Sequence, residues 1–397
     1  MRLSSLPDLL HYRLHAFITQ AWQRKGLFSL IFWPLSKLTA SYLWVNHKLY
    51  LHGFKKRVKL SKPVIVVGNV TVGGAGKTPV VIELVKYLTS TGRSVGVISR
   101  GYGASRGRGG TAGASSVPLA KKGATNTNDL SLNTDSDSKF NPTHEFQSAM
   151  NLSGTTEVTQ HVSAQVCGDE PKLIHAKTGV PVFVGTQRAE AARLLILKYP
   201  EIDVLISDDG LQHQQLARDL NVIIFDDTGL GNGFLLPAGP LRENWPIQYP
   251  NAKEEFVLST NNAKAPIGFK VKRALSDFAY NREGQKLDLR VPTHKRIHAL
   301  AGIARPYLFF RMLEERGLQL SQTTALQDHA NLNEEQLSMI FKSSAVSSAE
   351  ETLFLCTEKD AIKIWEFSDC VWAVPLDCTL ETQFIDIFED WLVGAGV

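Results

Sequence analysis

Cysteines are few in this sequence, and none has the spacing of a metal site. The chain contains Cys167, Cys356, Cys370 and Cys378 without a C-x-x-C pair, so a zinc site is not indicated. A cleavable secretory signal is also missing, because the region after Met1 is polar and has no small-residue cleavage pattern. We therefore expect a cytosolic protein with reduced thiols.

Excess charge of one sign and long hydrophobic runs are absent as well. The chain has 43 Lys and Arg against 39 Asp and Glu, a net charge of +4, and so small an excess does not indicate nucleic-acid binding. A membrane-spanning helix needs roughly 18 to 20 apolar residues in succession, whereas the nearest candidate, Leu27–Leu35, is soon followed by Lys37. With 397 residues the chain is too long for one typical domain core, so we expect two domains.

Aromatic residues and a basic cluster stand side by side near the start of the chain. The segment Leu27–Leu51 is apolar and aromatic, and basic residues follow it: Trp33, Tyr42, Trp44 and Tyr50, then Lys55, Lys56 and Arg57. This pattern is typical of a helix that lies on an anionic membrane surface. A helical hairpin packed on the protein core explains it equally well at this point.

Strand and helix patterns alternate through the middle of the chain. Pro63–Asn69 is a short continuous apolar run, as in a strand buried on both faces. Lys77–Thr91 has its apolar residues on one helical face, and Ser94–Ser99 is a second buried strand. Further strands are expected at Pro181–Gly185, Asp203–Ser207 and Asn221–Asp226, with a helix at Arg188–Lys198. This alternation predicts an α/β fold with a doubly wound parallel sheet.

Two other stretches complete the predicted organisation. Residues 104–165 are rich in Ser, Thr, Asn, Gly and Ala, and we expect a disordered insertion because such a segment buries too little surface to offset its ordering entropy. From Arg296 onward strands and helices alternate again, which predicts a smaller second α/β domain. Its expected elements are strands at His298–Ile303, Thr352–Cys356 and Val371–Val374 and helices at Arg305–Arg316, Asn333–Lys342 and Glu381–Leu392. The predicted divisions are an N-terminal helical segment at 1–60, a main domain at 61–290 and the smaller domain at 291–397.

A glycine-rich loop between the first strand and the first helix carries the strongest functional signal. It reads GNVTVGGAGKT from Gly68 to Thr78, and its glycines let backbone N–H groups converge on phosphate oxygens beside the positive end of the helix. Lys77 can reach the outer phosphates, and the Thr78 hydroxyl can hold Mg²⁺. The match to G-x-x-x-x-G-K-[ST] is imperfect because Thr71 replaces the first glycine, and a turn without a ligand is the alternative. The residues predicted to bind nucleotide are Thr71, Val72, Gly73, Gly74, Ala75, Gly76, Lys77 and Thr78.

Paired carboxylates stand at two points where a metal ion or a base could act. Asp208 and Asp209 end a hydrophobic strand, where an acidic residue can order Mg²⁺ and its waters, although an isolated Asp-Asp-Gly is only a turn. Asp169 and Glu170 precede a proline. They could cap a helix, or they could serve as base and metal ligand.

Two further charged pairs are weaker candidates. Arg242 and Glu243 end a proline-containing loop and could be a surface ion pair or part of a site. Asp328 and His329 lie in the second α/β unit, and a lone pair of this kind is usually structural. A histidine fixed by a carboxylate can nonetheless support proton transfer near neutral pH.

Seven short strings, in this order along the chain, resemble the tetraacyldisaccharide 4′-kinase family, the lipid A 4′-kinases. The strings are VGNVTVGGAGKTP at 67–79, SRGYG at 99–103, GDEP at 168–171, SDDGLQH at 207–213, GNGFLLPAGPLRE at 231–243, ALAGIARP at 299–306 and TEKDAIKI at 357–364. Their joint presence is specific, and the resemblance covers nearly the whole chain from about Tyr42 onward outside the insertion. The family shares the imperfect phosphate loop, which accounts for Thr71.

The resemblance implies a P-loop NTPase-like kinase domain and a smaller C-terminal domain joined by a two-stranded linker, with ATP and Mg²⁺ between them. It implies transfer of the γ-phosphate to the 4′-hydroxyl of a tetraacylated glucosamine disaccharide 1-phosphate, a late step of lipid A biosynthesis. The N-terminal helix would dock the enzyme peripherally on the anionic cytoplasmic face of the inner membrane. We expect a monomer.

The resemblance also assigns roles to single residues. Asp169 matches the family's proposed catalytic base, and His329 matches the histidine paired with it. Glu170, Asp208 and Asp209 match acidic metal-site and catalytic residues, with the metal ligands expected at Thr78, Glu170 and Asp209. Arg242 and Glu243 match active-site positions.

The sequence departs from the family pattern at two points. Ala330 follows His329 where the family usually has a second histidine, and the segment between SRGYG and GDEP is much longer than usual.

Two other classes share part of these signals. A deviant-Walker regulatory ATPase would use membrane binding as its output, but such proteins usually carry an extra lysine early in the phosphate loop, where Val70, Thr71 and Val72 stand here. A soluble small-metabolite kinase would have no use for the basic and aromatic N-terminal segment.

Overall fold

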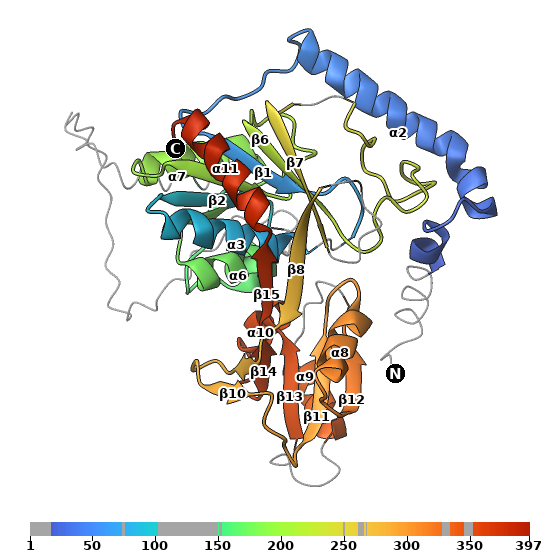
Figure 1. The fold of residues 1–397 in the computed structure, drawn as a ribbon, viewed down its shortest axis with the longest axis vertical. Coiled ribbons are helices and arrows are strands. Elements are labelled where there is room, and N and C mark those ends of the chain that lie inside the picture. Colours follow the sequence, from blue (N-terminus) through green and yellow to red (C-terminus); the bar gives the residue numbers. More distant parts are fainter. Residues whose placement is uncertain are drawn as a thin grey trace, which may run out of the picture.

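The computed structural model describes residues 17–73, 76–101, 150, 153–248, 251–260, 266, 268–327, 334–344 and 352–397. Within these residues the chain forms two sheets, one above the other along the long axis of the molecule (Figure 1).

The larger sheet has nine strands among the described residues, in the order β15-β8-β7-β6-β1-β5-β2-β4-β3. Its strands are β1 Val64–Gly68, β2 Val95–Ser99, β3 Thr156–Glu157, β4 Val182–Val184, β5 Val204–Asp208, β6 Leu220–Phe225, β7 Glu254–Thr260, β8 Phe269–Leu275 and β15 Leu376–Leu380. Neighbouring strands are parallel except at the two edges, where β3 pairs with β4 and β15 pairs with β8 antiparallel. The central strands are continuous apolar runs because helices cover both faces of the sheet.

Those covering helices divide the apolar residues into two cores. On one face lie α3 Lys77–Ser90, α6 Asp169–Thr178 and α11 Thr382–Ala395, and on the other lies α7 Arg188–Lys198. The expected doubly wound α/β sheet is confirmed, and α7 has the predicted bounds.

The smaller sheet has six strands in the described chain, in the order β10-β9-β14-β13-β11-β12. Its strands are β9 Phe278–Tyr280, β10 Lys286–Asp288, β11 Arg296–Ala301, β12 Leu320–Ala325, β13 Thr352–Thr357 and β14 Val371–Val374, with helices α8 Pro306–Glu315, α9 Glu334–Ser344 and α10 Glu358–Ile364. The chain enters this sheet through β8 and leaves it through β15, and these two strands pair with each other as the connection between the domains (Figure 1).

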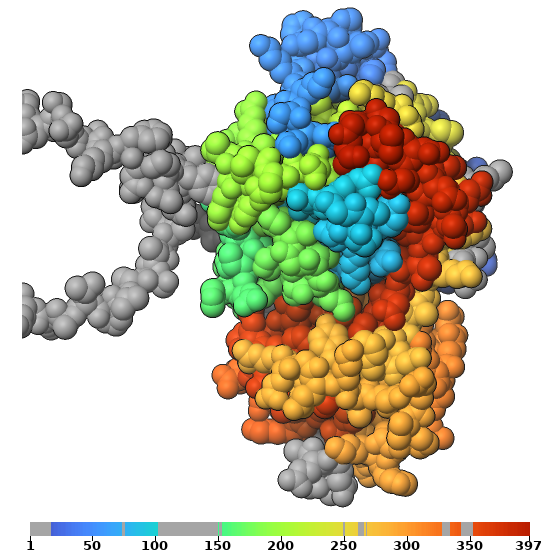
Figure 2. All heavy atoms as spheres, turned by 60° about the vertical axis from the view of Figure 1, so that its left-hand side comes forward, coloured from blue at the N-terminus to red at the C-terminus, as the bar shows by residue number. Residues whose placement is uncertain are grey.

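The sheets differ from the predicted domain divisions at both ends of the smaller domain. Strands β9 and β10 precede residue 291 but belong to the smaller sheet, whereas β15 and α11 return to the larger one. Helix α11 lies beside α3 (Figure 2), where Phe384, Phe388 and Leu392 are fully buried and the Tyr87 hydroxyl donates to Glu389 Oε2 at 2.8 Å. Helical periodicity predicts such an apolar stripe but does not say which sheet it covers.

The end of the expected insertion is part of the larger domain. Strand β3 pairs with β4, and Val158 is 1% exposed in the core next to the short helix α5 Ala164–Cys167. Antiparallel pairing at a sheet edge stabilises this polar stretch in a way that its composition does not indicate. Residues 102–149, which make up most of the expected insertion, lie outside the described residues.

The N-terminal segment forms one helix, α2 Leu27–Leu51, along the outside of the larger domain (Figure 1). One side contacts the 232–241 loop, where the Thr39 hydroxyl donates to the Leu236 carbonyl oxygen at 2.7 Å and Asn232 donates to Ser29 Oγ at 2.8 Å. No helix in the described ranges has the length and apolar content needed to cross a membrane.

Candidate active site

The glycine-rich loop joins the central strand β1 to helix α3, as the sequence predicts. At Gly68 the chain passes so close to the next strand's loop that an added Cβ would meet Leu211 Cγ at 2.7 Å. Gly76, just before the helix, has φ +68°, a left-handed conformation that glycine adopts without strain. Gly74 and Ala75 lie outside the described residues.

Backbone hydrogen bonds fix the glycine-rich loop to the loop that carries Arg242 and Glu243. Val72 N donates to the Pro240 carbonyl oxygen at 2.8 Å, and Arg242 N donates to the Val70 carbonyl oxygen at 2.7 Å. Thr71, at the position of the missing glycine, forms a β-bridge with Leu241 and is buried. The Arg242 and Glu243 side chains therefore belong to the site and are not an isolated surface ion pair.

Asp208 and Asp209 face the start of α3 because β5 is the parallel neighbour of β1. In this register Asp208 lies opposite Val67, one residue before the loop. The Lys77 Nζ lies 3.1 Å from Asp209 Oδ1 and 3.2 Å from Asn69 Oδ1, and Arg242 Nη1 donates to Asp209 Oδ1 at 3.2 Å. Asp209 holds a left-handed backbone with φ +49°, a strained conformation that is common at functional sites.

The two neighbouring carboxyls have opposite pKa shifts. Burial and the nearby charges of Glu170 and Asp209 raise the pKa of Asp208 to about 7. Burial also opposes ionisation of Asp209, but the Lys77 and Arg242 cations outweigh it and lower that pKa below its usual value. Among the described residues, Asp208 Oδ1 is buried without a hydrogen-bond partner. An added cation would satisfy this oxygen and relieve the repulsion between the carboxylates.

The residues present fit Mg²⁺ in particular. No group of three His, Cys, Asp or Glu side chains in the described part of the chain could hold a metal ion without other ligands. Mg²⁺ usually keeps several waters and binds through one or two carboxylates together with substrate phosphates. Asp208, Asp209 and the Thr78 hydroxyl, at the start of α3, supply a donor set of that kind.

Asp169 and Glu170 form the first turn of α6 and contact the smaller domain. Asp169 is 3% exposed, and its Oδ1 accepts the Glu170 backbone N–H at 2.9 Å. From α10, Lys363 Nζ lies 3.4 Å from Asp169 Oδ2, and Lys359 Nζ lies 3.3 Å from Glu170 Oε1. The predicted partner of Asp169, His329, lies outside the described residues, as does Asp328.

Four polar residues that the motif reading passed over also lie at this site. Gln212 Nε2 donates to the Asn69 carbonyl oxygen at 3.2 Å and to Glu243 Oε1 at 2.7 Å, which links the phosphate loop to the 236–243 loop. Arg188, 4% exposed at the start of α7, has its pKa lowered by burial against the opposing pull of Asp209 and Asp208. Burial and the Arg188 charge lower the pKa of His213 to about 4. Asn69, Gln212 and His213 lie inside strings already noted in the sequence, but Arg188 is in none of them.

A phosphate loop facing two carboxylates, on a doubly wound sheet with a second domain attached, is the arrangement of a P-loop phosphotransferase. The family model for LpxK, tetraacyldisaccharide-1-P 4'-kinase, matches residues 28–120 and 149–393, and the chain belongs to this family.

Full-length relatives agree with the family model. The chain is 37% identical to the tetraacyldisaccharide 4'-kinase of Polaromonas naphthalenivorans over 379 residues, 94% of each chain. It is 38% identical to that of Haemophilus influenzae over 356 residues, 89% of this chain and 87% of the relative. A crystal structure of the "apo" form of LpxK from Aquifex aeolicus in complex with ATP is similar in fold, with a TM-score of 0.67 at 24% identity, covering 93% of this chain and 99% of that one.

These matches confirm the predicted activity, a tetraacyldisaccharide 4'-kinase of lipid A biosynthesis. They set aside the regulatory ATPase and the small-metabolite kinase. They also narrow the insertion, because residues 121–148 have no counterpart in the family model and residues 149–165 do.

Deleting residues 121–148 should leave a folded, active kinase. The family model does without them, and loop-closure free energy changes slowly with loop length. A deletion of residues 105–159 should fail, because it removes β3 and Val158 from the core, and burial of one valine stabilises by about 1.5 to 3 kcal/mol. Thermal melts and kinase assays on both variants check this, and equal melting temperatures would contradict it.

Proposed function

We propose that this kinase transfers the γ-phosphate of ATP to the 4′-hydroxyl of a tetraacylated glucosamine disaccharide 1-phosphate, with Asp169 as the general base. The observation that supports it best is the convergence of two acidic pairs on one cation. Asp208 and Asp209 end a strand beside Lys77, and the Glu170 charge acts on Asp208 from the start of α6. A nucleotide phosphate on the loop would therefore lie between Lys77 and the carboxylates.

The nucleotide side of the site works through positioning and charge neutralisation, which phosphoryl transfer needs more than covalent chemistry. Backbone N–H groups from Thr71 to Thr78 bind the phosphates, and Lys77 exchanges its contact with Asp209 for the outer phosphate. Arg242, held 3.2 Å from Asp209, stays close enough to contact the transferred group. Mg²⁺, when bound at Thr78, Asp209 and Glu170 or Asp208, neutralises charge that develops on the phosphoryl oxygens.

The acceptor side is built on Asp169. The carboxylate accepts the proton of the sugar 4′-hydroxyl as that oxygen attacks the phosphorus, and His329 is the proposed partner that receives or orients this proton. Asp169 lies between two domains and is shielded from water, which favours transfer to the sugar over ATP hydrolysis.

The assay that tests the reaction uses γ-labelled ATP and the disaccharide lipid precursor, with the product lipid separated and its label located. Label on the 4′ position supports the proposal. Label released only as inorganic phosphate would overturn it and would restore the regulatory ATPase.

We further propose that α2 binds the membrane surface without crossing it, so that the enzyme is peripheral on the cytoplasmic face of the inner membrane and acts as a monomer. The outward side of α2 exposes a row of large apolar side chains: Leu27, Leu30, Ile31, Trp33, Leu35, Leu38, Tyr42, Trp44 and Val45. A contiguous patch of this kind on one helix usually marks an interaction surface.

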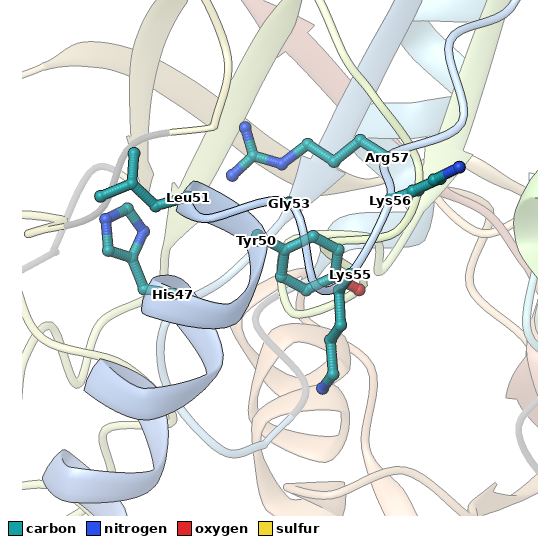
Figure 3. A pocket seen from close by; sticks show the side chains of 7 residues that line it. All are labelled: His47, Tyr50, Leu51, Gly53, Lys55, Lys56 and Arg57. Atoms are coloured by element: carbon teal, nitrogen blue, oxygen red, sulfur yellow. The ribbon is translucent and has the colours of Figure 1, made fainter.

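A basic hollow lies at the end of this helix, as an anionic surface requires. The cavity, of about 520 Å³, is lined by His47, Tyr50, Leu51, Gly53, Lys55, Lys56 and Arg57 (Figure 3). Lys55 Nζ and Arg57 Cζ lie 5.7 Å and 5.6 Å from the centre of the Tyr50 ring. Basic residues near an anionic membrane contribute about 1 kcal/mol each, and salt screens them.

Replacing Leu30, Ile31 and Leu38 together by serine should weaken binding to anionic liposomes at least about tenfold, since each large apolar side chain contributes up to about 1.5 to 3 kcal/mol when fully buried. These side chains are 62%, 63% and 66% exposed, so the melting temperature and ATP affinity should not change. Flotation with liposomes and a thermal melt measure both effects. The apparent KM for the lipid substrate should rise.

The matched control replaces Leu197 and Val393, which are 69% and 68% exposed on α7 and α11, away from α2. This variant should float like the natural chain. Changing Lys55, Lys56 and Arg57 to glutamine should give a milder, salt-dependent loss. Unchanged flotation of the α2 variant would sink the membrane proposal.

A further inference from the structure

The TEKDAIKI string, which the reaction as described does not use, forms α10 in the smaller domain and contacts α6 in the larger one. Ion pairs run along this contact. Lys363 pairs with Asp169 and Lys359 with Glu170 at the start of α6, while Glu358 pairs with Lys177 near its end. A fourth pair, Lys172 with Glu366 at 3.0 Å, lies between them.

Helix α10 is fixed rigidly to the smaller sheet. The Thr357 hydroxyl caps it by accepting Asp360 N at 3.2 Å. Asp360 is fully buried, and its Oδ2 accepts the Gly302 backbone N–H at 2.8 Å. A Cβ at Gly302 would meet Asp360 Oδ1 at 2.7 Å, so only glycine permits this approach. The two lysines, four residues apart, therefore move with the smaller domain.

Charges face Asp169 from both helices. Lys363 Nζ is 3.4 Å from Asp169 Oδ2 and also 3.4 Å from Asp360 Oδ1, and Lys359 Nζ is 3.9 Å from the same Asp169 oxygen. Glu170 adds a negative charge next to Asp169 on α6. A carboxylate as buried as Asp169 is costly unless it is paired. The pairing charges come from the other domain, so the orientation of Asp169 depends on how the two domains dock.

We propose that Lys363, assisted by Lys359, is a positioning residue that holds the Asp169 carboxylate toward the acceptor only while the smaller domain is docked on α6. The proposal rests on the role of Asp169 as base. Domain docking then assembles the base, and an open enzyme does not activate the acceptor hydroxyl. Closure of this kind couples substrate binding to chemistry.

The test compares Lys363→Met, which removes the charge but keeps the side-chain length, in two backgrounds. In the natural chain it should lower kcat about 10- to 100-fold, the size found for outer-shell residues that orient a ligand. KM for ATP should change little. In an Asp169→Asn background the same change should cost less than about twofold more, because residues that act through one another are not additive. Lys363→Arg should keep kcat within a few-fold.

The matched control is Lys172→Met, which breaks an ion pair of the same interface without touching Asp169. It should keep kcat within about twofold, since an isolated ion pair of limited exposure contributes modestly. Thermal melts of all variants show whether they fold. If Lys363→Met does not fold, Lys363→Arg and Lys359→Met are measured in both backgrounds by the same criteria.

Three results overturn the inference: full kcat in Lys363→Met, the same fold-loss in both backgrounds, or an equal loss in Lys172→Met. A fully active Asp169→Asn variant would instead overturn the base assignment. The two failures are thereby distinguishable.

Discussion

A Lys77→Ala variant should transfer phosphate at least about a hundredfold more slowly than the natural chain, because one preorganised charge contact to the reacting group typically contributes about 3 kcal/mol or more to transition-state stabilisation. In the structure the Lys77 ammonium contacts Asp209 and Asn69 and has 10% of its side chain exposed. It is the cation that begins α3, directly after the phosphate loop. Initial rates with labelled ATP and the lipid precursor measure the loss.

The fold should survive this change. Asp209 keeps its contact with Arg242, and the loop keeps its backbone bonds to Pro240 and Val70. Lys86→Ala, an exposed lysine on the same helix, is the matched control and should leave the rate and the melt unchanged. Near-normal turnover of Lys77→Ala, in a protein that melts normally, would refute the assignment of the ATP site.

The sequence predicts the central elements of the fold well because their signals are local. Strands β1, β2, β5 and β6 are buried on both faces, so each is a continuous apolar run bounded by turn residues. The phosphate loop and its helix follow from a few adjacent residues. The bounds of α7 and β14 match the predicted ones residue for residue.

Contacts between distant segments could not be predicted in the same way. Nothing in residues 381–395 says that α11 covers α3 and not the smaller sheet, because periodicity gives a helix and an apolar face but no partner. Strand β3 is two residues of ordinary composition, and only its pairing with β4 places it in the domain. The prediction for residues 104–165 therefore differs from the structure where the polar stretch meets a sheet edge.

The candidate site divides along the same line. Lys77, Thr78, Asp208 and Asp209 were predictable because each stands in a motif at the end of a strand or the start of a helix. Arg188 was not, because its importance lies in burial beside carboxylates from another strand. The α10 lysines reach Asp169 across two domains, and a string such as TEKDAIKI gives no indication of that contact. The assignment of His329 remains a prediction.

Asp169→Asn should lower kcat by about 10²- to 10⁴-fold, the usual contribution of a positioned general base. Asparagine keeps the size of the side chain and an oxygen that can accept the Glu170 backbone N–H, which Asp169 Oδ1 accepts at 2.9 Å. It cannot take the proton of the acceptor hydroxyl. ATP affinity, measured by displacement of a fluorescent nucleotide, should change modestly, because Asp169 faces Lys363 and Lys359 and not Lys77.

The matched control is Asp203→Asn, in which the lost carboxylate also accepts a backbone N–H, that of Ser94 at 2.8 Å, but lies before β5 at the opposite end from the site. It should leave kcat near that of the natural chain. His329→Ala should also lower kcat, and the double variant with Asp169→Asn should lose less than the two factors multiplied, since a base and its partner act as a unit. A multiplicative loss would make His329 a structural residue, and an Asp169→Asn enzyme with the natural kcat would require another base.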